Sequence, residues 1–403
     1  MTESAGAELD AIPATHRRMS ASRALWLNAT VMLSFFAAST APSPLYALYR
    51  EAWGFSALTL TVVFASYAFA LLAALLVFGS LSDYRGRREA LLIALLLEIA
   101  SLPLFWLADS VTWLFAARVL QGVATGIATS ALSAGLLDLN RERGALLNSV
   151  APLLGMAIGA VGTGALAEFA PAPTKLVFEL LLAAFLLQTI AAFWLPETVQ
   201  RRSGALASLR PRLAVPLQAR ATLWRVLPAN TATWALGGFY TSLGPTLGAM
   251  VTGVHSPTLG GIVVASLVLS GAVAVLLVRG RTPRFASATG SAALAAGVGV
   301  TLIGIELHST GLFFAGSRIA GYGFGAAFNG TVRSLVPLAE PHERAGLMSI
   351  FYVLSYLAFS VPALIAGLCA GHFGLQATSL GYGLVLIVMA CSAGLAMVRP
   401  QQD

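Results

Sequence analysis

Apolar residues gather in long runs along the chain, and short polar stretches separate one run from the next. Twelve runs reach the length of about 20 residues that a helix needs to cross a bilayer. They lie at 24–46, 58–81, 90–108, 111–137, 145–168, 174–195, 226–253, 258–279, 285–307, 310–337, 344–369 and 374–397. The pattern therefore predicts an all-α integral membrane protein with twelve transmembrane helices.

Composition supports this class and excludes others. Of 403 residues, 57% are hydrophobic and only 10% are charged, whereas a soluble domain carries about 25% charged residues. Such a chain cannot cover a water-facing surface, which excludes a soluble enzyme, a disordered protein and a nucleic-acid-binding domain. The two cysteines, Cys369 and Cys391, lie 22 positions apart inside apolar runs, a spacing that indicates neither a metal site nor a redox pair. No cofactor and no metal are expected.

The positions of the basic residues predict the orientation. If the first 23 residues are cytoplasmic, 20 of the 24 basic residues lie on that side, and only Arg50 and Lys175 lie on the other. This asymmetry follows the positive-inside rule. It places both termini in the cytoplasm of a cell whose inner (plasma) membrane holds the chain, and no cleavable signal peptide is apparent.

A polar stretch with six arginines, 197–225, divides the chain at its middle. We expect a cytoplasmic arm at 1–23, six-helix bundles at 24–196 and 226–398, a cytoplasmic loop between them, and a tail at 399–403. A repeat supports the division, because Arg118 and Arg318 lie 200 positions apart in the fourth and tenth runs. Two parallel six-helix repeats are a known transporter plan, with the substrate site between them near mid-membrane.

The turn between the second and third runs carries the most specific motif. Its matching positions resemble the signature of the major facilitator superfamily: Gly79, Leu81, Asp83, Gly86, Arg87, Arg88 and Leu91. Tyr84 departs from the pattern, since a basic residue is common there. The resemblance implies the major facilitator fold and a charge network that latches the two halves on the cytoplasmic side. An ordinary basic loop is the alternative. The corresponding turn of the second half, at Gly280 and Arg281, lacks the acid, so the latch is expected to be asymmetric.

Two residues are candidates for proton coupling. Arg118, Gln121 and Gly122 resemble the superfamily's Arg-x-x-Gln-Gly motif, which the family associates with the central cavity and with proton coupling. Arginine stays protonated, so a carboxylate must titrate, and Glu98 is the only acid deep in a span of the first half. Burial among leucines favours the neutral acid, and a nearby arginine favours the carboxylate. The alternatives are a packing arginine and a packing acid, and Glu179 is a weaker proton-carrier candidate.

Polar and aromatic residues inside the spans are candidates for the substrate cavity. The set comprises Asn28, Gln121, Thr125, Trp234, Tyr240, Arg318, Tyr322 and Asn329. Arginines on both sides of the cavity favour an anionic or acceptor-rich substrate, although either can instead pair with protein groups. Trp234 and Tyr240 can equally be interface anchors.

Pro152, Gly155 and Gly159 in the fifth run resemble the Gly-Pro-x-x-Gly-Gly motif of the drug/proton antiporter branch. In that branch the motif bends a helix against the other half. Ala151 and Met156 replace two of its glycines. Generic close packing of a small-residue helix explains the glycines equally well.

These features predict a secondary transporter that exports small amphipathic compounds, drug-like molecules or metabolites, in exchange for protons by alternating access. No nucleotide-binding loop is present in the sequence, and no enzyme activity is expected. The expected partners are a small-molecule substrate, protons and the lipid bilayer, with no nucleic acid, and the chain is expected to be monomeric. A proton-coupled importer of a sugar or organic anion is the alternative, and a transporter-like sensor is a third possibility.

Overall fold

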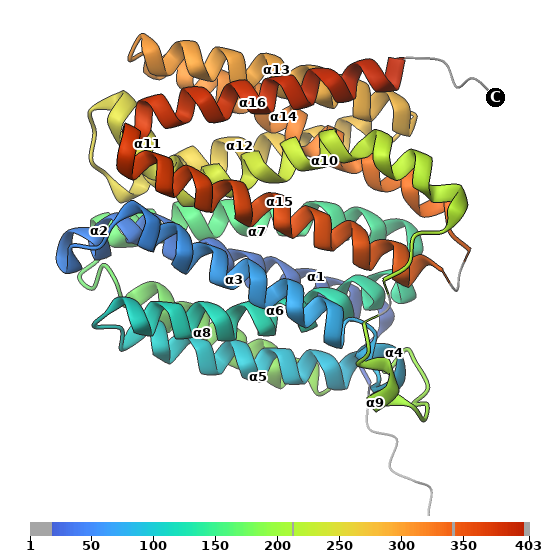
Figure 1. Cartoon of the computed structure of the whole chain (residues 1–403). Coiled ribbons are helices and arrows are strands. Elements are labelled where there is room, and N and C mark those ends of the chain that lie inside the picture. Colours follow the sequence, from blue (N-terminus) through green and yellow to red (C-terminus); the bar gives the residue numbers. More distant parts are fainter. Residues whose placement is uncertain (1–17, 212, 341–342, 399–403) are drawn as a thin grey trace, which may run out of the picture.

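A computed structural model describes residues 18–211, 213–340 and 343–398, and every regular element in that part is a helix (Figure 1). The expected tail at 399–403 and nearly all of the expected arm at 1–23 lie outside the described residues. The first half comprises α1 Ala21–Thr40, α2 Pro42–Trp53, α3 Ala57–Phe78, α4 Leu81–Arg85, α5 Arg87–Trp106, α6 Val111–Leu139, α7 Arg141–Phe169 and α8 Leu176–Ala192.

The second half repeats this order after a short connecting helix. It comprises α9 Ala205–Ser208, α10 Leu217–Ser242, α11 Gly244–Thr252, α12 Pro257–Val278, α13 Pro283–Glu306, α14 Thr310–Leu335, the 3₁₀ turn η1 Val336–Leu338, α15 Arg344–Phe373 and α16 Leu375–Val398. Part of the expected loop at 197–225 is therefore helical, because α10 begins nine residues before 226. Hydroxyl side chains cap α3 and α12 in the same way, with Ser56 accepting from Thr59 N–H and Ser256 from Leu259 N–H.

Each of the twelve expected runs coincides with one helix or with a helix broken once. In the described part of the chain, nine helices are long and apolar enough to cross a membrane. The other three are α8, which has 17 residues, and α10 and α14, which carry polar and charged residues among their apolar ones. Polar helices in a membrane face protein or a pathway rather than lipid. The predicted all-α, multi-pass fold is confirmed.

The outer surfaces of the bundles are apolar. Leu187 and Val388 are each 68% exposed, and Leu395 is 66% exposed. Large exposed apolar surfaces of this kind are unfavourable in water and suit contact with lipid chains.

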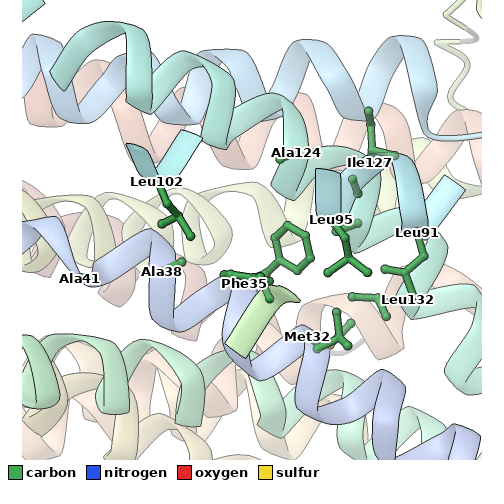
Figure 2. Close-up of a cluster of buried hydrophobic side chains, with 14 of the residues drawn as sticks. Met32, Phe35, Ala38, Ala41, Leu91, Leu95, Leu102, Ala124, Ile127 and Leu132 are labelled. Atoms are coloured by element: carbon green, nitrogen blue, oxygen red, sulfur yellow. The ribbon is translucent and has the colours of Figure 1, made fainter. Parts of the chain in front are cut away.

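The two halves lie side by side and meet mainly through α7 against α12 and α3 against α15 (Figure 1). Each half has its own core. Figure 2 shows part of the first core, in which Met32 and Phe35 of α1 point toward Leu95 of α5 and Leu132 of α6. This packing fixes α5 and α6 relative to α1, and the polar residues described next depend on that placement.

Candidate functional site

A chain of three buried polar side chains joins α5 to α6. The side-chain amide of Gln121 donates to Glu98 Oε1 at 3.1 Å, and Gln121 Oε1 accepts from Arg118 Nη1 at 2.8 Å. All three residues are 0% exposed. Gln121 thus connects the acid to the base without a direct ion pair between them. We call this set the charge chain.

The break between α1 and α2 supplies acceptors for the charge chain. Pro42 has no N–H, so the carbonyl of Ala38, four residues earlier, lacks a helical donor. Gln121 Nε2 donates to that carbonyl at 3.2 Å, and Arg118 Nη1 donates to the carbonyl of Ser39 at 2.7 Å. The proline-containing end of the first run was visible in the sequence, but its link to the arginine was not.

Several atoms of the charge chain remain unpaired. Glu98 Oε2 and the Nε and Nη2 atoms of Arg118 are buried and have no hydrogen-bond partner among the described residues. The guanidinium lies over the ring of Tyr67, 4.6 Å from its centroid, and 5.9 Å from that of Phe64. These cation–π contacts stabilise the charge, but the second carboxylate oxygen has no such compensation. An unpaired buried carboxylate oxygen is costly and is a site at which a proton is favoured.

The pairing of Arg118 with Arg318 is wrong by one residue. A side chain on Gly122 of α6 would clash with the carbonyl of Tyr67 and with Ala70 of α3. A side chain on Gly321 of α14 would clash in the same way with the carbonyl of Leu267 and with Ser270 of α12. The equivalent positions are therefore 199 apart on α6 and α14, so Ser317 is the counterpart of Arg118.

The single-residue shift changes the surroundings of the second arginine. Ser317 is buried and its Oγ lies 2.7 Å from the hydroxyl of Tyr240. Arg318, one residue later, is rotated by about 100° on the helix and is exposed. Tyr240 is therefore part of the interior of the second half, and the two arginines do not face one cavity from opposite sides.

An aromatic cluster lies where the halves meet. The ring centroid of Trp234 on α10 is 4.9 Å from that of Tyr356, 5.7 Å from that of Phe328 and 6.0 Å from that of Phe359. Phe64 and Tyr67 of α3 complete the cluster, with Phe64 5.1 Å from Phe359 and Tyr67 packed in the same group as Tyr356. We call these six residues the interface cluster. Since Arg118 lies over Phe64 and Tyr67, the charge chain ends against it.

Other expected cavity residues lie elsewhere. Asn28 packs near Gly135 and lines a small cavity with Arg87 and Arg88, at the end of the bundle where α1 begins. Thr125 Oγ1 donates within α6 to the carbonyl of Gln121 at 2.9 Å. Tyr322 packs on a small cluster that includes Ala274 and Val278 of α12, and Asn329 Oδ1 accepts from Arg333 at 3.4 Å. None of these four residues belongs to the interface cluster.

The signature turn forms the expected charge network. Arg87 pairs with Asp83, donates to Ser82 Oγ at 2.7 Å and lies 3.2 Å from Asp138 Oδ2 at the end of α6. Leu81 begins the short helix α4, and Gly79 ends α3. The described polar partners of the Arg87 side chain all belong to the first half, so a latch between the halves stays a prediction.

Sequence reasoning missed the carboxylate that holds this turn. Glu197, just after α8, accepts from the backbone N–H groups of Arg87 at 2.8 Å and Arg88 at 3.2 Å, where α5 begins. A carboxylate at a helix N-terminus satisfies free donors and matches the helix dipole. Gly86 adopts φ +108°, and a side chain there would clash with the same carboxylate. No local signal links positions 110 residues apart.

Pro152 lies inside the continuous helix α7. The motif glycines that follow it face their own half, because side chains on Gly155 and Gly159 would clash with the carbonyls of Leu33 and Ala37 of α1. Gly164, one turn further on, is the residue that touches Pro257 of the other half. The expectation that Gly155 and Gly159 press on the other half is therefore corrected.

A second contact between the halves lies at the opposite end of the molecule from the signature turn. Glu168 at the end of α7 accepts from Ser256 Oγ and from the backbone N–H of Thr258 at 3.2 Å, where α12 begins. Among the residues that the structure places, no group of three His, Cys, Asp or Glu side chains could hold a metal ion.

Comparisons with known proteins agree with this architecture. The family model of the Major Facilitator Superfamily matches residues 28–298. A mouse (Mus musculus) protein, solute carrier family 2, facilitated glucose transporter member 10, is 29% identical over 175 residues, which cover 42% of this chain. The chain spans 31% of the length of that relative.

Solved structures resemble the chain over nearly its whole length. The nucleoside transporter NupG matches with a TM-score of 0.69 and 12% identity, covering 94% of this chain and 100% of NupG. The human organic anion transporter MFSD10 (TETRAN) matches with a TM-score of 0.65 and 18% identity, covering 93% of this chain and 100% of its own. Identities this low show a common fold. Because the family model covers more than half of the sequence, the chain belongs to the Major Facilitator Superfamily and is a multi-pass membrane transporter.

Proposed function

We propose that the chain is a secondary transporter that exports small amphipathic compounds in exchange for protons, with its arginine-rich end in the cytoplasm. The charge chain is the observation that carries the proposal. A fully buried carboxylate with one unpaired oxygen is a group that can take up and release a proton. Exchange requires that proton binding and substrate binding oppose one another.

Arg118 is placed to connect the two events. When Glu98 is ionised, the Gln121 bridge lies between opposite charges and stabilises both. When Glu98 is neutral, Arg118 loses its balancing charge and depends on the carbonyl of Ser39 and the ring of Tyr67. Because Tyr67 belongs to the interface cluster, a change at the guanidinium reaches the surface on which the halves move. Population shift then requires only that each conformation favour one protonation state.

Proton-coupled import of a sugar or organic anion remains the second candidate. The described relatives are named for glucose, nucleosides and organic anions, which motivates including these classes in a test. Nothing in the charge chain itself selects a direction.

The test uses purified protein in liposomes with an imposed pH gradient. Labelled sugars, nucleosides, organic anions and fluorescent amphipathic compounds are offered with the acidic side inside and then outside. Exchange predicts substrate accumulation on the acidic side. Accumulation on the alkaline side would replace export with import, and flux that ignores the gradient would overturn proton coupling.

A further inference from the structure

We infer that the interface cluster, with Asn230, is the substrate site and that it selects flat, neutral molecules bearing a hydrogen-bond acceptor and a donor on one edge. The inference rests on the proposed transport function and specifies its substrate class. Six aromatic rings from α3, α10, α14 and α15 meet here (Phe64, Tyr67, Trp234, Phe328, Tyr356 and Phe359). Both halves contribute rings, so movement of the halves opens and closes this site.

Two unpaired polar atoms give the site its specificity. Asn230 is 1% exposed, and its Nδ2 donates to Ser355 Oγ at 2.8 Å, but its Oδ1 has no partner among the described residues. One helical turn later on the same face of α10, Trp234 Nε1 is buried and likewise unpaired. Leaving such groups without partners costs about 1–3 kcal/mol each. A ligand that accepts from the indole and donates to the amide removes both costs.

Ring geometry favours a flat ligand. Trp234 meets Phe328 at an interplanar angle of 74° and Phe359 at 80°. Edge-to-face rings of this kind present both faces and edges to a neighbouring ring. A planar heteroaromatic molecule can therefore replace ring contacts that separate when the halves move apart.

Charge excludes cations from this site. The guanidinium of Arg118 already lies over two of the cluster's rings, so a cationic ligand meets like charge. The four helices that build the cluster, α3, α10, α14 and α15, contain no Asp or Glu. Glu98, on α5, is separated from the cluster by Gln121 and Arg118.

Equilibrium binding to the purified full chain tests the inference without requiring transport. The probes are isoquinolone, a flat neutral lactam with adjacent acceptor and donor, its N-methyl derivative, which lacks the donor, and the cation N-methylisoquinolinium. We expect isoquinolone to bind about tenfold more tightly than its N-methyl derivative, the value of one hydrogen bond to a buried group. We expect the cation to bind more weakly than either.

Two variants assign the effect to the site. Trp234→Phe keeps a ring and removes the N–H, and it should weaken isoquinolone binding about five- to tenfold. Asn230→Leu should abolish the preference for isoquinolone over its N-methyl derivative. Trp26→Phe, at a side chain that is 56% exposed on α1, is the matched control and should change nothing.

Equal binding by Trp234→Phe and the wild type, tighter binding of the cation, or no binding of any probe would overturn the inference. Failure of the proposed function is separate. It would appear as pH-independent transport by protein whose probe binding follows this pattern.

Discussion

Ser317 occupies on α14 the position that Arg118 occupies on α6, as the matching contacts of Gly122 and Gly321 show. The two halves share a backbone plan but differ in charge at this position. In the first half an arginine reaches Gln121, and in the second half a serine meets the hydroxyl of Tyr240. The described part of the charge chain therefore belongs to one half.

This relationship predicts different outcomes for two neighbouring types of arginine. Arg118→Ala removes the buried partner of Gln121 and the cation over Tyr67, and we expect transport to fall by tenfold or more, because breaking a buried charge network costs about 3–5 kcal/mol. Arg318→Ala changes an exposed side chain and should leave transport within about twofold of wild type. Initial rates in liposomes measure both. A larger loss for Arg318→Ala than for Arg118→Ala would contradict the assignment.

Close packing of α7 on α1 predicts a stability difference among glycines of one helix. Gly155→Ala and Gly159→Ala place a methyl group against carbonyls of α1 and should each lower the free energy of unfolding by about 1–3 kcal/mol. Gly162→Ala is the control, since no atom lies within 4 Å of the added carbon. Thermal unfolding in detergent measures the order. Equal midpoints for all three variants would contradict the packing.

The signature turn predicts a similar contrast between the halves. Gly86 has φ +108° and faces Glu197, so Gly86→Ala should destabilise the protein by about 1–3 kcal/mol. Gly280 occupies the corresponding turn in the second half, has open space around it and should tolerate alanine. Unfolding midpoints of the two variants, compared with wild type, provide the measurement. A well-tolerated Gly86→Ala would show that the turn does not require glycine.

Glu168 predicts a conformational effect at the other end of the molecule. Its carboxylate holds the start of α12 through Ser256 and Thr258, so Glu168→Ala should favour separation of the halves there. A cysteine at Ala160, which is 0% exposed beside α12, should react faster with a maleimide in that variant. The experiment needs a background in which Cys369 and Cys391 are replaced. An unchanged labelling rate would show that the contact does not restrain opening.

Local patterns predicted the helices because length, hydropathy and basic flanks are written in consecutive residues. The Asp83–Arg87 pair was predictable for the same reason, since its members are four positions apart on one turn. Position within the helix was not: matching Arg118 to Arg318 by residue type ignored which face each presents. Glu197 was also missed, because its contact with the start of α5 depends on where α8 ends in space.

The charge chain was predicted in part. Burial of Glu98 and its proximity to Arg118 were expected from one acid and one arginine inside apolar runs. The role of Gln121 as the bridge, and of Ala38 and Ser39 as acceptors, depends on the break at Pro42 and on how α1 crosses α6. The interface cluster draws rings from four helices, and a single sequence gives no pairing among them.

Substrate-driven proton movement tests the central claim most directly. Liposomes that hold a pH-sensitive dye and the purified protein receive substrate on one side, and the proton flux in the opposite direction is recorded. We expect flux in wild type, none in Glu98→Gln, and wild-type flux in Glu179→Gln, which changes an exposed acid bonded to Trp106. Full proton flux in Glu98→Gln would contradict the assignment of Glu98 as the proton carrier.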